Sequence, residues 1–451
     1  MPETKRGYYP AFDGWRGIAI LWIVLGHAVY WHSWNLTGYG SFLYFLIYKL
    51  LPFPVDIFFV LSGFFITGLL LDVSGKFSIA GFLKKRALKI LPLYFLLLLT
   101  VLMVNRSFPD VAVKRTDIIK IPKTVWTVDQ VIIPGNFYSL EKANGEKATL
   151  LINKERNLAR LYYGENASRE LDGSLAGFGL ASPILNKNSV ITLNQRTIVD
   201  NDFLASWNPK ASVLPYFFMA HSFKPNDSLT GLTHLWFVKT IAQFYILYAL
   251  LFFVLHKLIA DHDKRKKILL FILIALSAMA IFSQISPVPL AILLGCLFKI
   301  LEPGYAGAET WFWKRAIPAI LIFAGCASIF VLTAGQITAG LPLVMPLASA
   351  SIIAGAYRLP YISRFILENP LLRWVGKYSY GIYLFHDPFL VFSEKFFRDY
   401  LHSGNFISIL AFIIFSVLLG AIMEKLVNFI FHLELLRFFR PENATAQTTS
   451  R

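Results

Sequence analysis

An arginine and a histidine interrupt the first long apolar stretch of the chain, and both residue types can carry charge or move protons. Arg16 and His27 lie within residues 14–30, a stretch long enough to cross a membrane as a helix. Their separation is about three helical turns, so both groups should share one helix face about 16 Å apart. Because ionisable groups are costly in lipid, that face should look into a helix bundle or a wet cavity. The alternative is that Arg16 reaches the headgroups and His27 only binds a neighbouring carbonyl.

A second histidine lies near the end of the chain, in the sequence KYSYGIYLFHDP. Ser379 and His386 are two helical turns apart and should share a face, and Tyr383 lies one turn before His386. A lone buried histidine is commonly a hydrogen-bonded core residue. Two membrane imidazoles, together with an arginine, favour proton-transfer chemistry instead.

These side chains could perform acid–base chemistry on a hydroxyl group. A neutral imidazole accepts a proton near physiological pH, so His27 is the candidate general base. Arg16 or Tyr383 could stabilise a developing oxyanion.

Four basic residues stand before the third apolar segment, in the sequence FLKKRALKILPLYF. Lys84, Lys85, Arg86 and Lys89 have helical spacing and should lie just inside the cytoplasmic face. Such a cluster can hold anionic lipid headgroups or the phosphates of a nucleotide-bearing ligand.

The second apolar segment, PVDIFFVLSGFFITG, begins with Asp56 and carries Ser62 and Gly63 at mid-membrane. Small residues at this depth permit close helix approach. Ser62 is therefore either part of a packing notch or a ligand contact.

The composition is that of a polytopic membrane protein. Of 451 residues, 56% are hydrophobic and 16% are charged, and the mean hydropathy is +0.56, which excludes an ordinary soluble enzyme. The expected fold is all-α, with about ten transmembrane helices. The apolar segments lie at about 13–33, 54–71, 88–104, 235–256, 268–284, 286–300, 316–333, 341–356, 378–397 and 406–431.

The lysines and arginines of the short connections all fall on one side of these segments, which is therefore predicted to be cytoplasmic. Both termini should lie on that side, including a tail at 441–451. The net charge of +16 then reflects loops beside anionic lipid rather than nucleic-acid binding. Cys296 and Cys326 have no spacing typical of a disulfide framework or a zinc site, so no metal is expected.

Residues 105–212 are polar and of mixed charge, and they follow the third segment on the opposite, outer side. Clusters of β-forming residues at 130–133, 149–153 and 190–193 predict a small β-rich extracytoplasmic module. It separates a region with the first three helices, 1–104, from one with the remaining helices, 213–440. The module is either a recognition element or a spacer or lid with no binding role.

The chain resembles the acyltransferase type 3 family of multispanning bacterial O-acyltransferases. The family pattern Asp-Gly-x-Arg-Gly, followed by a histidine, matches Asp13, Gly14, Arg16, Gly17 and His27. Further matches are VDIFFVLSGFFIT, KKRALKILPLY and YSYGIYLFH.

The resemblance implies transfer of an acyl group, most often acetyl from cytosolic acetyl-CoA, to a hydroxyl of an outer glycan such as O-antigen or exopolysaccharide. It implies a location in the bacterial inner membrane. His27 would be catalytic with Arg16 as its partner, and the basic stretch would hold the CoA phosphates.

One departure concerns an acidic residue that many members carry near Ile241, where this chain reads HLWFVKTIAQFY. Either that acidic residue is not required for the chemistry, or another group such as Asp13, Asp56 or His234 takes its orienting role. Two other function classes stay open: a secondary transporter or flippase for an anionic glycolipid, and a membrane sensor that reads an envelope ligand through residues 105–212. The halves of the chain show no self-similarity, which argues against a transporter.

Overall fold

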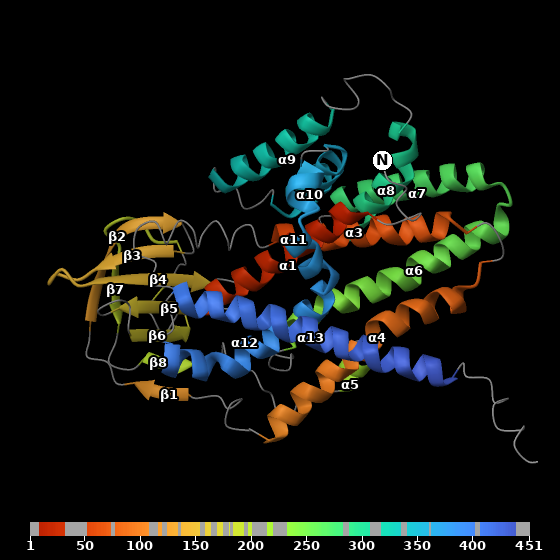
Figure 1. Ribbon diagram of the computed structural model, residues 1–451. Coiled ribbons are helices and arrows are strands. Elements are labelled where there is room, and N and C mark those ends of the chain that lie inside the picture. Colours follow the sequence, from red (N-terminus) through yellow and green to blue (C-terminus); the bar gives the residue numbers. More distant parts are fainter. Residues whose placement is uncertain are drawn as a thin grey trace, which may run out of the picture.

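The computed structural model of the chain is a bundle of long helices with a small β-sheet module at one end (Figure 1). It describes residues 9–31, 52–73, 77–107, 116–119, 124–133, 137–153, 158–163, 169–174, 180, 184–193, 197–200, 214–219, 232–282, 288–306, 317–334, 341–359, 362–401 and 406–438. The predicted tail at 441–451 and some basic residues of the orientation argument, such as Lys5 and Arg315, lie outside these ranges.

A long helix forms at each of the ten predicted apolar segments. These helices are α1 (Pro10–Trp31), α3 (Pro52–Leu71), α4 (Ile79–Ser107), α6 (Trp236–Leu258), α7 (His262–Phe282), α8 (Val288–Ala306), α9 (Ile317–Ala334), α10 (Leu341–Arg358), α12 (Ser379–Leu401) and α13 (Phe406–Phe438). By length and composition, four stretches within the described helices can cross a membrane: Phe53–Leu71, Ile79–Met103, Trp236–Leu258 and Ile409–Phe431. The full number of spans and their orientation stay predictions.

Short elements connect or precede the long helices. They are α5 (Leu214–Phe217), the 3₁₀ helix η4 (Thr233–Leu235), the π-helix η6 (Ile362–Leu367) and α11 (Pro370–Lys377). Asn369 caps α11, because its side chain accepts hydrogen bonds from the backbone N–H groups of Leu371 and Leu372, and Pro370 is preorganised for the first helical position.

Glycines let the backbones of α3 and α8 approach closely. A Cβ atom on Gly63 would lie 2.1 Å from the carbonyl oxygen of Ile292, and one on Gly295 would lie 2.0 Å from that of Val60, so α3 and α8 cross at this pair. Gly63 is therefore a packing position.

One glycine on each helix also allows a close contact between α1 and α11. A Cβ atom on Gly17 would lie 2.2 Å from the Leu372 carbonyl oxygen, and one on Gly376 would lie 1.8 Å from that of Asp13. Gly17 and Gly376 thus let α11 pack closely onto the first turns of α1, whereas Gly14 faces the Leu367 carbonyl of η6.

Within the described residues, the strands all lie between positions 116 and 200, inside the predicted module. They are β1 (Thr116–Ile119), β2 (Thr124–Ile133), β3 (Phe137–Glu141), β4 (Lys147–Asn153), β5 (Leu158–Tyr163), β6 (Arg169–Ser174), β7 (Val190–Leu193) and β8 (Thr197–Asp200). Six form an antiparallel sheet in the order β6-β5-β4-β3-β2-β7, and β1 pairs with β8. Alternate residues such as Trp126, Val128 and Tyr138 form a core of their own.

Figure 1 shows that α1 and α12 both run toward the end of the bundle that holds the strands, whereas α13 runs away from it. Residues late in α1 therefore lie in the half of the bundle near the sheet. Residues early in α1 and α4, and late in α13, lie in the other half.

Candidate active site

Two of the predicted residues meet directly. The Nδ1 atom of His27, near the end of α1, lies 2.8 Å from the Nε2 atom of His386 on α12. The two rings are nearly coplanar, with 8° between their planes. His386 is fully buried, whereas His27 keeps part of its surface accessible.

The partners of these rings determine which nitrogen carries the hydrogen. Nδ1 of His386 lies 2.7 Å from the backbone carbonyl of Tyr383, which can only accept, so this nitrogen is the donor. In a neutral His386 ring, Nε2 then has a lone pair and accepts from Nδ1 of His27. A neutral His27 is therefore left with an unprotonated Nε2, the form that a general base requires.

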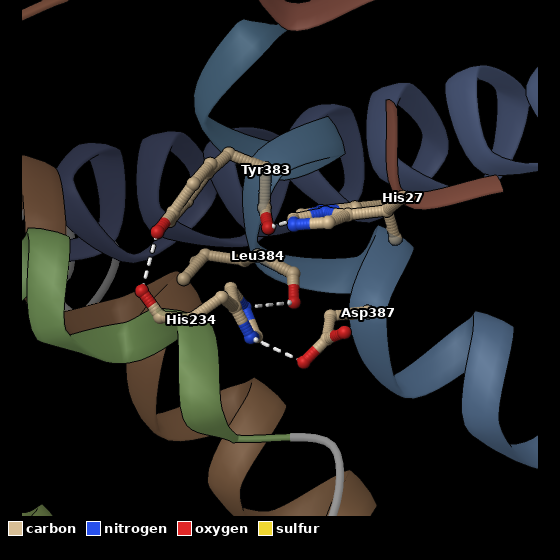
Figure 2. A network of polar contacts seen from close by, with 6 residues as sticks. His27, His234, Tyr383, Leu384 and Asp387 are labelled. Atoms are coloured by element: carbon tan, nitrogen blue, oxygen red, sulfur yellow. Dashed lines mark hydrogen bonds and ion pairs between the residues drawn. The ribbon is translucent and has the colours of Figure 1, made fainter. Parts of the chain in front are cut away.

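A third imidazole, that of His234 in η4, lies against the same turn of α12 (Figure 2). Its ring centroid is 5.4 Å from that of His386. Nδ1 of His234 lies 3.0 Å from a carboxylate oxygen of Asp387, and Nε2 lies 3.1 Å from the carbonyl oxygen of Leu384. The Tyr383 hydroxyl donates to the His234 backbone carbonyl.

The contact with Leu384 has a cause in the sequence. In an α-helix this carbonyl would accept from the N–H group four residues later, but that residue is Pro388, which has none. His234 supplies the missing donor. A buried carbonyl that would otherwise be orphaned is thereby satisfied.

The hydrogen bonds of the His234–Asp387 pair determine its net charge. Leu384 requires a hydrogen on Nε2 of His234, and the contact with Asp387 requires one more hydrogen between the two side chains. The pair is neutral overall, whether that hydrogen lies on the ring or on the carboxyl group. Both side chains are buried.

The structure does not bring Arg16 to the imidazoles. Its guanidinium donates to Asp13 over 3.2 Å and lies 4.7 Å from the centre of the Phe65 ring. Along α1 it is about 16 Å from His27, as the helical rise requires. The intervening residues on that side, Ala19, Ile20 and Ile23, are 0%, 0% and 2% exposed.

Arg16 instead belongs to a charged group in the other half of the bundle. Lys89 lies within electrostatic range of Arg16, Arg86, Asp13 and Glu424. Glu424 of α13 accepts a hydrogen bond of 2.8 Å from the backbone N–H of Gly381, in the first turn of α12.

The basic stretch is helical, as its spacing predicts: α4 begins at Ile79 and continues through it. Lys84 and Lys85 are exposed. Arg86 is partly buried and lies 5.7 Å from the ring centres of Phe82 and Tyr245.

Among the residues that the structure describes, the hydrogen bonds of the three imidazoles do not include the other predicted site residues. Ser379 is buried at the start of α12, and Ser62 is partly buried beside the Gly63 crossing. The described residues contain no group of three or more metal-ligating side chains in a suitable arrangement.

Asp387 is not among the site residues predicted from sequence, and His234 enters that prediction only as a possible orienting group. Asp387 follows His386 directly and Pro388 follows Asp387. A proline two residues after a candidate histidine is a signal that could have indicated a nearby side-chain donor.

Comparison with protein families assigns the chain. The model of the acyltransferase 3 family, described as an acyltransferase domain, matches residues 9–124 and 175–425. The chain belongs to the acyltransferase 3 family. No curated protein and no solved structure matches it.

The match to the acyltransferase 3 model includes His27, His234 and His386 and omits residues 125–174. The omitted residues contain β3, β4, β5, β6 and nearly all of β2. These strands therefore lie outside the part of the chain that the family model matches.

Proposed function

We propose that this membrane acyltransferase moves an acetyl group from acetyl-CoA to a hydroxyl of a cell-envelope or extracellular glycan. The observation that carries the proposal is the His27–His386 pair, in which the partly exposed residue His27 has an unprotonated Nε2. Family membership supports acyl transfer. The acetyl group and the glycan come from the resemblance described above.

The proposed reaction begins with proton removal from the acceptor. His27 Nε2 takes the hydroxyl proton while the hydroxyl oxygen attacks the thioester carbonyl. The carbon–sulfur bond then breaks, CoA leaves as a thiolate, and the thiolate recovers the proton from His27. The imidazole ends neutral, ready for another cycle.

The separation of the two clusters supports different roles for them. Arg16, Lys89 and Arg86 lie in the half of the bundle away from the sheet, where cationic groups could bind the phosphates of the donor. The imidazoles lie in the half near the sheet, where a glycan would arrive. In this arrangement the termini face the cytoplasm of a bacterium, the protein lies in the inner membrane, and residues 105–212 lie outside.

Tyr383 has a positioning role in this proposal. Its hydroxyl hydrogen is engaged by the His234 backbone carbonyl, so it is not available to an oxyanion without breaking that bond. Asp13 acts through Arg16, whose guanidinium it holds. Ser62 remains a candidate donor contact beside the α3–α8 crossing.

The test compares the purified full chain with its His27→Ala variant, reconstituted in lipid. Wild type should release free thiol from acetyl-CoA, and cells that express it should contain glycans heavier by one acetyl group in mass spectra. His27→Ala should lower both by about 10²-fold or more, the usual scale for a lost acid–base group. A folded variant with near-normal activity would refute the assignment of His27. A wild-type chain that neither binds nor turns over acetyl-CoA would favour transport or sensing.

A further inference from the structure

The turn of α12 that carries His386 is attached to η4 at three points, and all three involve His234. The Tyr383 hydroxyl donates to its backbone carbonyl, Nε2 donates to the Leu384 carbonyl, and Nδ1 contacts Asp387. These contacts join parts of the chain that are about 150 positions apart: 149 for Tyr383, 150 for Leu384 and 153 for Asp387.

A proline also weakens this turn of α12. Pro388 removes the helical hydrogen bond to Leu384, and a proline inside a helix typically costs about 3 kcal/mol relative to alanine. His386 lies within the same turn and bonds to the Tyr383 carbonyl over 2.7 Å. Any change in the turn would therefore move the ring that contacts His27.

The His234 ring is itself fixed from both sides. Asp387 holds Nδ1, which aims Nε2 at the Leu384 carbonyl. The residue is 5% exposed, and its ring contacts the Tyr383 ring edge-on, with 5.2 Å between the centroids. It is thus a rigid donor placed at the position of a missing backbone N–H.

We propose that His234 is the positioning residue of the active site: it replaces the N–H that Pro388 lacks and so holds His386 in line with His27. Asp387 orients His234 for this task. The proposal rests on the acyl-transfer function above and adds that His234 takes no proton from the substrate.

Two variants of His234 separate its two hydrogen bonds. In His234→Gln the side-chain amide reaches about as far as Nε2, so the bond to Leu384 can persist. In His234→Asn the amide reaches only about as far as Nδ1, so the contact with Asp387 persists and the bond to Leu384 is lost. We expect His234→Asn to lower the kcat of thiol release from acetyl-CoA by about tenfold or more, the scale of a lost buried hydrogen bond. His234→Gln should lose only a few-fold, and the KM for acetyl-CoA should stay constant in both.

Pro388→Ala supplies the decisive test, because it restores a backbone N–H that can donate to Leu384. In the double variant that combines His234→Asn with Pro388→Ala, we expect kcat to be no more than a few-fold below that of Pro388→Ala alone. Pro388→Ala alone should leave kcat nearly unchanged, since the Leu384 carbonyl can accept hydrogen bonds from both the new N–H and His234. The four chains form a double-mutant cycle with strong coupling.

An equal loss of kcat from His234→Asn with and without Pro388→Ala would overturn the proposal, because it would place His234 among the reacting groups. His234→Gln performing no better than His234→Asn would also overturn it. Thermal unfolding and acetyl-CoA binding confirm that each variant is folded. If the wild-type chain shows no turnover of acetyl-CoA, the proposed function fails instead, and the two failures are distinguishable.

Discussion

His27 and His386 are 359 positions apart in the chain, and a single hydrogen bond of 2.8 Å joins Nδ1 of the first to Nε2 of the second. This bond also determines which nitrogen of His27 carries the hydrogen. Because Nε2 of His386 accepts, it keeps the hydrogen of His27 on Nδ1 and the lone pair on the nitrogen that faces away.

This relationship predicts a difference between two variants of His386. In His386→Gln the side-chain oxygen can still accept from His27, whereas His386→Ala leaves the Nδ1 hydrogen without that acceptor. We expect thiol release from acetyl-CoA to fall about 10²-fold in His386→Ala and clearly less in His386→Gln. Equal losses in two folded variants would contradict the role of His386 as an acceptor.

The charged group around Arg16 predicts where the donor binds. Removal of Lys89 or Arg86 should weaken acetyl-CoA binding about tenfold, because charge-assisted hydrogen bonds to phosphate are lost, and the effect should shrink at high salt. Lys267→Ala, which removes an exposed lysine from the first turns of α7, is the matched control. Titration calorimetry measures the acetyl-CoA affinity of the Lys89, Arg86 and Lys267 variants. Unchanged affinity in both test variants would leave the basic stretch with a role in lipid anchoring.

The α1–α11 contact predicts a large cost for a single methyl group. Gly376→Ala would bring Cβ within 1.8 Å of the Asp13 carbonyl oxygen, so the two helices must separate. We expect a loss of about 1–3 kcal/mol or more in stability, together with lower activity, because Arg16 moves with α1. In the control Gly81→Ala, the nearest atom is 3.4 Å from the new Cβ, and stability should be unchanged or slightly raised. Similar unfolding temperatures for both variants would show that α11 is not held in this way.

The position of the β-sheet module predicts that it governs the choice of the glycan acceptor and takes no part in acetyl-CoA binding or thioester cleavage. A Gly/Ser linker in place of residues 108–212 would join the end of α4 to the start of α5. Acetyl-CoA binding and basal thiol release should survive, because the imidazoles and the Arg16 group lie on helices outside the module, while transfer to the native glycan should drop. Loss of donor binding in a folded, inserted protein would make the module part of the donor site.

Much of the fold could be predicted from composition and periodicity. Ten apolar segments correspond to ten long helices, and the predicted β clusters at 130–133, 149–153 and 190–193 lie in β2, β4 and β7. The predicted apolar segment 88–104 lies within α4, and the helix itself begins earlier, at Ile79, because lysine and arginine lower the hydropathy of residues 79–87 without weakening their helix propensity. Hydropathy does not predict the helix α11, since its eight residues are too few for an apolar span.

The site was less accessible to sequence reasoning. The spacing of Arg16 and His27 placed both on one helix and about three turns apart, but it could not show which residues of other helices lie near each of them. The contacts of His234 with Asp387 and Leu384 depend on tertiary packing between α12 and η4. No local pattern encodes such a pairing.

The buried side of α1 between its two functional ends has a kinetic consequence. α11 fixes the helix near Gly17, and His386 fixes it near His27, while Ala19, Ile20 and Ile23 fill the interval with almost no accessible surface. In the proposed reaction, a pantetheine arm that follows this side of α1 from Arg16 to His27 would have to part the neighbouring helices before the thioester arrives. Each turnover would then include a gating step, and its rate would depend on how readily the surrounding lipid lets those helices move.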